Sequence, residues 1–125
     1  MQDISGLPQE GQQLINGYGD EGFRVSGARY EGSVLIMPEK TQSWPLSDIS
    51  ELSVESLSLL TPAAAEIEIL LIGCGNGMVF IEEDLRTHLR AHGIVVDAMS
   101  TGAAVRTYNV LLLERRRVAA ALIAV

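Results

Sequence analysis

The chain has 125 residues, 47% of them hydrophobic and only 5% aromatic, which predicts one domain with a largely aliphatic core. Nine basic and 16 acidic residues give a net charge of −7, which disfavours nucleic acids and anionic membrane surfaces as partners. The single cysteine excludes an internal disulfide. The sequence shows no signal peptide and no apolar run of the ~20 residues that a membrane helix needs. We therefore expect a cytoplasmic protein without stable membrane insertion.

The first part of the chain predicts antiparallel strands joined by short turns. Residues 1–12 are polar and contain Gly and Pro, so we expect a loosely held lead-in. Residues 16–22 are rich in turn-forming residues, and residues 23–25 alternate between apolar and polar as a half-buried strand does. Residues 29–37 contain an apolar run that stops before a proline, and residues 38–42 are typical of a polar loop.

A short helix is predicted over residues 53–60. Ser53 suits the N-cap position because its hydroxyl can accept from a free backbone N–H, and Pro62 is expected to end the helix. Trp44, which precedes it, is expected to close one end of the core as a large anchor. The residues expected on the buried face of the helix are Val54, Leu57 and Leu60.

The stretch 66–77 is the strongest single indication of the fold. Residues 69–72 are all apolar, and the glycines Gly73, Gly75 and Gly77 follow. A short apolar run bounded by turn residues predicts a strand buried on both faces. We therefore expect Leu70 to be among the most buried residues, with helices covering both faces of the sheet.

The clearest helix is predicted over residues 80–93. Acidic residues occupy its first turn and basic residues its last, which matches the helix dipole, and Gly93 is placed to end it. Glu82 and Arg86 are four apart and could form an ion pair. Residues 94–96 predict a buried strand, so the unit is strand–helix–strand and the two strands should be parallel.

A third helix, over residues 103–113, should be buried on most sides because it is apolar almost all round. Ser100 or Thr101 can cap it, and the arginines at 115–117 suit its C-terminal end. Residues 118–125 are nearly all apolar and predict a final strand. The expected fold is a single three-layer α/β domain, with a mixed central sheet, packed helices and N-terminal antiparallel strands.

The glycine-rich loop suggests ligand binding without completing a known motif. Gly73-Cys74-Gly75-Asn76-Gly77 resembles part of a dinucleotide fingerprint, but Met78 stands where the third glycine is needed, and the Lys-Ser/Thr of a P-loop is missing. Cys74 could act as a nucleophile, although no base and orienting group accompany it in the sequence. A small buried residue at a tight turn is the interpretation that we favour for Cys74.

Two further pairs of polar residues lie on the predicted helices. His88 and His92 share a helix face and could bind a metal, but no third ligand is identifiable, so we predict no metal site and no cofactor. Arg106 and Asn109 are neighbours on one helix face near its start, where either a small anion pocket or a structural ion pair would explain them; we favour the structural role. No catalytic set is apparent. The hypothesised ligand-binding residues are Gly73, Cys74, Gly75, Asn76, Arg106 and Asn109.

Several motifs occur together in a recognisable order. They are Ile15-Asn16-Gly17-Tyr18-Gly19, Gly32-Ser33-Val34-Leu35, Trp44, Glu68-Ile69-Leu70-Leu71-Ile72-Gly73-Cys74-Gly75, Thr107-Tyr108-Asn109-Val110-Leu111 and Arg116-Arg117-Val118-Ala119-Ala120-Ala121-Leu122-Ile123. From about residue 14 to 123 the chain resembles the Mth-type domain family of unassigned function, which includes the mitochondrial complex I assembly factor 3 proteins and the adipogenesis-associated Mth-type domain proteins. The resemblance implies a three-layer fold and no established catalytic activity, and its eukaryotic members act as assembly partners for a respiratory complex.

The chain departs from the family pattern at two positions. Cys74 stands where Thr is usual, and Arg115 stands where a glycine is usual. The last helix therefore lacks its expected left-handed glycine, and we expect it to end in a strained or different turn.

The resemblance implies a non-catalytic protein-binding or assembly-factor-like domain whose partner is a protein, with respiratory-complex assembly components as candidates. The alternative is a small-molecule or anion-binding domain, including an enzyme, that uses the loop at 73–77 with Arg106 and Asn109. The sequence does not decide between a monomer and a homo-oligomer.

Overall fold

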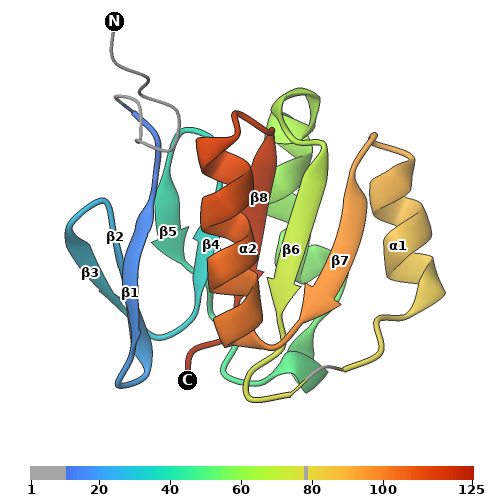
Figure 1. Ribbon diagram of the computed structural model, residues 1–125. Coiled ribbons are helices and arrows are strands. Elements are labelled where there is room, and N and C mark those ends of the chain that lie inside the picture. Colours follow the sequence, from blue (N-terminus) through green and yellow to red (C-terminus); the bar gives the residue numbers. More distant parts are fainter. Residues whose placement is uncertain (1–10, 78) are drawn as a thin grey trace, which may run out of the picture.

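The computed structural model describes residues 11–77 and 79–125, and within them the strands form two sheets (Figure 1). Most of the predicted lead-in, residues 1–10, therefore lies outside the described residues. The first sheet is antiparallel and consists of β1 (Ile15–Gly19), β2 (Gly22–Val25) and β3 (Ala28–Glu31). The second has the order β5-β4-β8-β6-β7 and consists of β4 (Val34–Ile36), β5 (Thr41–Ser43), β6 (Ile69–Gly73), β7 (Val95–Met99) and β8 (Val118–Leu122).

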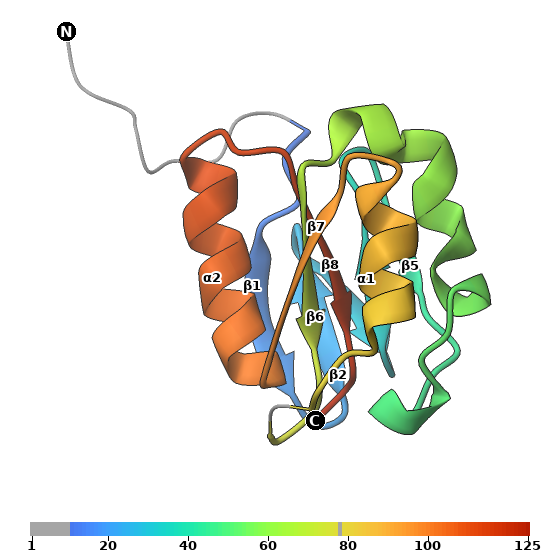
Figure 2. The ribbon, with the colours of Figure 1, turned by 90° about the vertical axis from the view of Figure 1, so that its right-hand side faces the viewer.

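Helices cover both faces of the five-stranded sheet, as the doubly buried strand requires (Figure 2). Helix α2 (Thr101–Leu113) lies on one face, and α1 (Glu83–Arg90) lies on the other with the 3₁₀ helix η2 (Glu55–Glu66). A second 3₁₀ helix, η1 (Ile49–Glu51), precedes η2. The predicted three-layer α/β domain with a mixed sheet is confirmed.

The pairing of the strands explains the mixed character of the sheet. β6 is parallel to β7 and to β8, whereas β8 is antiparallel to β4. The predicted parallel strand–helix–strand unit is thus β6-α1-β7, and residues 118–122 return to the sheet as expected. The middle position belongs to β8, which is buried throughout, and β6 lies beside it.

Alternate residues of the interior strands supply two separate apolar cores. Leu70 and Ile72 face the first core, which contains the leucines of η2 and α1, and Leu71 faces the second core, beneath α2 and the three-stranded sheet. This alternation is the period-two geometry of a strand. Leu70 is completely buried, as predicted.

The region before β6 differs from the prediction because η2 is longer. It runs to Glu66 with Pro62 inside it, whereas Pro62 was expected to end a helix over residues 53–60. Proline has no backbone N–H, so a 3₁₀ helix that contains it loses one hydrogen bond. The fixed φ of proline is nevertheless compatible with the helix. Burial of Leu57 and Leu60 offsets that loss. The N-cap is residue 54, although the Ser53 hydroxyl oxygen does accept from the Ser56 N–H at 3.1 Å.

Helix α1 is shorter than the predicted helix over residues 80–93. It begins at Glu83, ends at Arg90 and is followed by Gly93 with φ +84°. The predicted pair between Glu82 and Arg86 is absent from the ion pairs of the described residues; Arg86 Nη1 instead donates to the Val96 carbonyl oxygen at 2.8 Å. A hydrogen bond from a charged donor to a carbonyl oxygen at the sheet edge contributes more to stability than an exposed ion pair does.

Two predicted loops contain strand residues. The turn-rich segment 16–22 contributes most of β1, and the polar loop at 38–42 already contains the start of β5 at Thr41. Backbone pairing with β2 overrides the weak strand propensity of glycine and asparagine in β1, and pairing with β4 draws Thr41 and Gln42 into β5.

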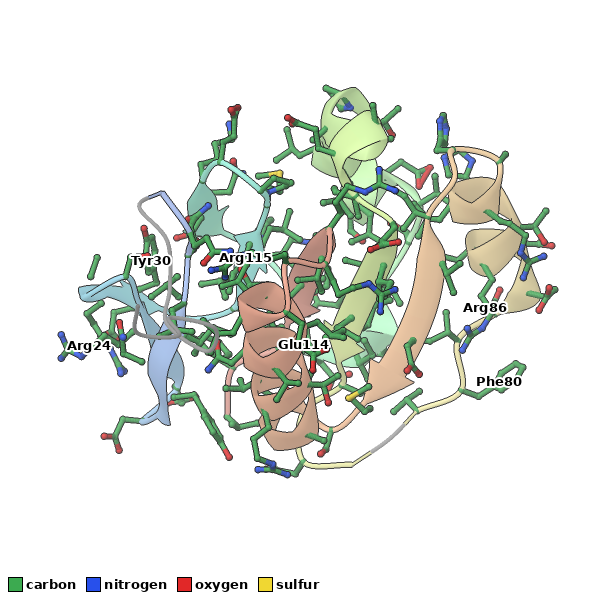
Figure 3. All side chains as sticks on the ribbon, turned by 45° about the horizontal axis from the view of Figure 1, so that its top comes forward. Arg24, Tyr30, Phe80, Arg86, Glu114 and Arg115 are labelled. Carbon is green, nitrogen blue, oxygen red and sulfur yellow. The ribbon has the colours of Figure 1, made fainter. Side chains whose placement is uncertain are left out.

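The end of α2 has the glycine-type geometry without the glycine. Arg115 has φ 65°, its N–H donates to the Leu112 carbonyl at 3.0 Å, and the Arg116 N–H donates to the Leu111 carbonyl at 3.0 Å. These two bonds define a Schellman motif, whose left-handed position normally holds glycine. The Cβ atom of Arg115 (Figure 3) therefore strains the backbone at this turn.

Replacing Arg115 by glycine should stabilise the protein. Relief of left-handed strain, worth about 1–2 kcal/mol, exceeds the extra chain entropy that glycine brings to the unfolded state. We expect the free energy of unfolding from chemical denaturation to rise by about 0.5–1 kcal/mol. Arg115→Ala is the matched control, because it removes the side chain but keeps Cβ; equal stabilisation by both variants would contradict the role of strain.

Replacing Leu70 by alanine should lower the free energy of unfolding by about 2–5 kcal/mol, through lost burial and the cavity left behind. The control is Glu82→Ala, at an exposed position, with an expected change of about 0.5 kcal/mol or less. Chemical denaturation of both variants measures the difference. Equal effects would mean that β6 does not carry the core.

Candidate functional site

The glycine loop after β6 is shaped by close packing. A Cβ atom on Gly73 would lie 2.9 Å from Leu122 Cδ2 and 3.0 Å from Thr101 Cα, and Gly75 has φ +96°. The first glycine thus lets the start of α2 approach the strand ends, and the second permits the turn. Asn76 and Gly77 are exposed beyond this junction.

Thr101 fastens the loop to the sheet and to α2. Its side-chain oxygen accepts from the Gly75 N–H at 2.9 Å and donates its hydrogen to the Ile123 carbonyl at 2.8 Å, while its own N–H donates to the Gly75 carbonyl at 2.8 Å. The Cys74 N–H donates to the Met99 carbonyl at 2.8 Å. Two loop amides that a phosphate would use are therefore engaged internally, which supports a structural role for the loop.

Ser100, not Thr101, is the N-cap of α2, and its hydroxyl accepts from the Ala103 N–H at 3.4 Å. Either residue could be the cap on the sequence alone. The role of the Thr101 hydroxyl could not be predicted, because its hydrogen-bond partners are distant in the sequence.

Cys74 is buried against the first core, with its Sγ 3.8 Å from the Ile72 carbonyl oxygen. His88 and His92 are exposed on α1, with ring centroids 5.3 Å apart. Among the residues that the structure describes, no three His, Cys, Asp or Glu side chains gather as a metal site would need. This placement fits a small packed residue at position 74 and two solvated histidines.

Asn109 and Arg106 point to different surroundings. The Asn109 Oδ1 accepts from the Ile15 N–H at 2.9 Å, and its Nδ2 donates to the Ile15 carbonyl at 2.8 Å, so its amide group fixes β1 to α2. Arg106 is exposed and forms no ion pair with the described residues. A Cβ atom on Gly102 would lie 2.6 Å from the Tyr18 hydroxyl oxygen and 3.6 Å from Arg106 Nη1, so these two groups flank the first turn of α2.

Two residues of the triple arginine are engaged by one carboxylate. Arg116 Nε lies 2.9 Å and Arg117 Nη2 lies 3.9 Å from oxygen atoms of Glu68. Hydrogen bonds from Arg116 and from the Arg117 backbone lower the pKa of the Glu68 carboxyl. The cluster ties the end of α2 to the start of β6.

An exposed apolar feature was missed from the sequence. Phe80 is 81% exposed (Figure 3) and borders a hollow of about 390 Å³ between residues 49–54 and 79–85. The exposure of Phe80 was not predicted because the helix was expected to include this residue. The acidic residues that follow it indicate that the helix starts later.

Comparison with known proteins relates the chain to one family. A family model described as a protein of unknown function (DUF498/DUF598) matches residues 15–123. The chain belongs to this family. It is 38% identical over 109 residues to an uncharacterised protein of Rhodobacter capsulatus, covering 87% of this chain and 82% of that protein. It is 32% identical over 110 residues to the NADH dehydrogenase [ubiquinone] 1 alpha subcomplex assembly factor 3 of Xenopus tropicalis, covering 88% of this chain but only 60% of the relative.

Solved structures support the same DUF498/DUF598 fold. A crystal structure described as an outer membrane protein from Bartonella henselae matches with a TM-score of 0.85 and 39% identity, over 91% of this chain and 96% of that one. A Bordetella pertussis protein described as a Mth938-like domain matches with a TM-score of 0.79 and 29% identity, over 98% and 90%. The predicted family resemblance is confirmed. In residues 11–77 and 79–125, no helix has the length and apolar character needed to cross a membrane.

Asn109→Ala should weaken the attachment of β1. Loss of the two hydrogen bonds to Ile15 is expected to lower the free energy of unfolding by about 1–3 kcal/mol and to speed amide exchange at Ile15. Arg106→Ala, one turn away and exposed, is the control and should change stability by about 0.5 kcal/mol or less. An Asn109 variant as stable as this control would contradict the structural role.

Cys74→Thr should fold like the parent, because a threonine hydroxyl can donate to the Ile72 carbonyl that the thiol now faces. We expect a change in the free energy of unfolding below about 1 kcal/mol. Cys74→Ser, which lacks the methyl group, should cost more through incomplete filling of the site. Loss of a measurable activity in Cys74→Thr at an unchanged melting temperature would instead reveal a functional thiol.

Proposed function

We propose that this DUF498/DUF598 chain is a non-catalytic, protein-binding domain that assists the assembly of a multisubunit complex. The carrying observation is the match to a protein named as an NADH dehydrogenase assembly factor, at 32% identity over 88% of this chain. The matched region spans nearly the whole fold; because a fold alone does not determine function, the transfer of a domain-level binding role rests on this sequence match. In this proposal the domain acts in the cytoplasm, its partner is a protein, and respiratory-complex assembly components are the first candidates.

The arrangement of the chemically reactive residues also favours binding over catalysis. The thiol of Cys74 is buried, and the two histidines lie exposed on α1. A thiol enzyme needs an accessible nucleophile with a base in hydrogen-bond reach. The glycine loop, whose amides at 74 and 75 are engaged, is better suited to packing than to phosphate binding.

The chain spans about 60% of the length of the assembly factor that it matches, so only the role of the shared domain is proposed. The test is affinity purification of the tagged full chain from cells that make it, with and without mild crosslinking. We expect a stoichiometric protein partner that an unrelated acidic domain with the same tag does not recover. A chain that is recovered alone, even after crosslinking, would contradict the proposal.

A small-anion site is the second candidate function. Arg106 is exposed without an ion pair among the described residues, and the Tyr18 hydroxyl lies beside it at the start of α2. A thermal-shift screen with nucleotides, phosphate and carboxylates tests it, with Arg24→Ala on β2 as the control for Arg106→Ala. The anion site requires stabilisation by one of these compounds that disappears only in Arg106→Ala; unchanged melting temperatures would exclude it.

A further inference from the structure

We propose that the hollow beside Phe80 receives a segment of a partner protein that inserts an apolar side chain and carries Lys or Arg next to it. This inference rests on the proposed protein-binding function and names its surface and the chemistry of its partner.

The hollow opens directly onto the first core. One wall is the segment around η1, whose apolar residues Ile49, Leu52 and Val54 are half-buried and pack against that core. The other contains Ile81 and Leu85, which are buried members of the same core. A side chain that enters the hollow therefore meets apolar surface on two sides. Its volume of about 390 Å³ lies in the lower part of the range of ligand pockets.

Exposed apolar residues extend the surface beyond the hollow. Phe80 is 81% exposed and Val79 is 41% exposed, and both line the hollow. The ring of Phe80 projects away from the body of the domain on the loop before α1 (Figure 3). Covering such a ring removes a large apolar area from water, and aromatic residues beside a pocket are common binding hot spots.

The charge at the hollow is acidic, and its carboxylates form no ion pair with any residue that the structure describes. Glu82 and Asp84 line it, and no Lys, Arg or His is found among its described lining residues. Arg86, which could have paired with Glu82, is turned to the Val96 carbonyl, and Arg90 pairs with Glu83 at 3.8 Å. Two carboxylates at an apolar opening favour a partner with positive charge beside its apolar anchor.

The same charges weigh against other occupants. A second copy docked symmetrically on this face would bring its own Glu82 and Asp84 against these two, so like charges would meet. An anionic lipid surface or a nucleotide would be repelled for the same reason. A basic, apolar protein segment is the occupant that satisfies both the hollow and its rim.

Site-specific photo-crosslinking tests this surface with the full chain. A photoreactive phenylalanine analogue is placed at position 80, and in a control chain at position 110, where Val110 is exposed on α2. After irradiation in cells that make the protein, the crosslinked peptide is identified by mass spectrometry. We expect a product only from position 80, in which the partner peptide holds an apolar residue next to Lys or Arg. The double variant Glu82→Lys with Asp84→Lys should reduce its yield at least about fivefold, whereas Glu114→Lys at the end of α2 should not.

A peptide copied from the crosslinked segment then provides the binding measurement. Phe80→Ala should weaken its binding, followed by fluorescence anisotropy, at least tenfold, or about 1.4 kcal/mol. Val110→Ala should bind like the parent. Because both positions are exposed, we expect neither variant to change the melting temperature. An unchanged melting temperature then verifies that the variants are folded.

The failures of the two proposals are distinguishable. A partner recovered by general crosslinking but joined at position 110, or not joined at position 80, overturns this surface and leaves the binding function standing. Crosslinks to a second copy or to lipid, a partner peptide without basic residues, or full binding by Phe80→Ala also overturn it. Recovery of no partner by either route contradicts the binding function itself.

Discussion

Two neighbouring strands of this protein have no face in water, and the rest of the fold follows from that constraint. β6 and β8 lie side by side inside the sheet, and their alternate residues feed separate cores. Each face must be covered, so α1 and η2 are needed on one side and α2 with the three-stranded sheet on the other. Small residues make this layering close: Ala119, Ala120 and Ala121 of β8 are completely buried.

The junction at the ends of these strands explains the glycine loop without a ligand. Gly73 allows α2 to begin against the sheet, and the Thr101 hydroxyl bonds both the loop and Ile123, the residue that follows β8. Such a junction needs a residue without a side chain facing a residue that can both donate and accept a hydrogen bond. The motif that resembles a nucleotide fingerprint is thus accounted for by packing and internal hydrogen bonding.

The sequence predicts those elements of the fold that have a clear local pattern of apolar residues. The apolar run of β6, the amphipathic pattern of α1 and the parallel direction of the strands on either side of α1 could all be anticipated. It could not predict pairings set by distant contacts: Asn109 bonds Ile15, 94 positions away, and Thr101 bonds Gly75, 26 positions away. The early start expected for α1 has the same origin, because Phe80 fits the helical pattern but has no core to enter. Tertiary context overrides propensity at these places.

Core packing accounts for Ile81 before α1, but not for the aromatic ring beside it. Ile81 is buried in the first core, whereas Phe80 directly before it is 81% exposed. A polar residue would suit that position without exposing a ring to water, so core packing does not require phenylalanine at position 80. Its apolar area becomes useful only when another surface covers it, and the carboxylates beside it restrict which surface can.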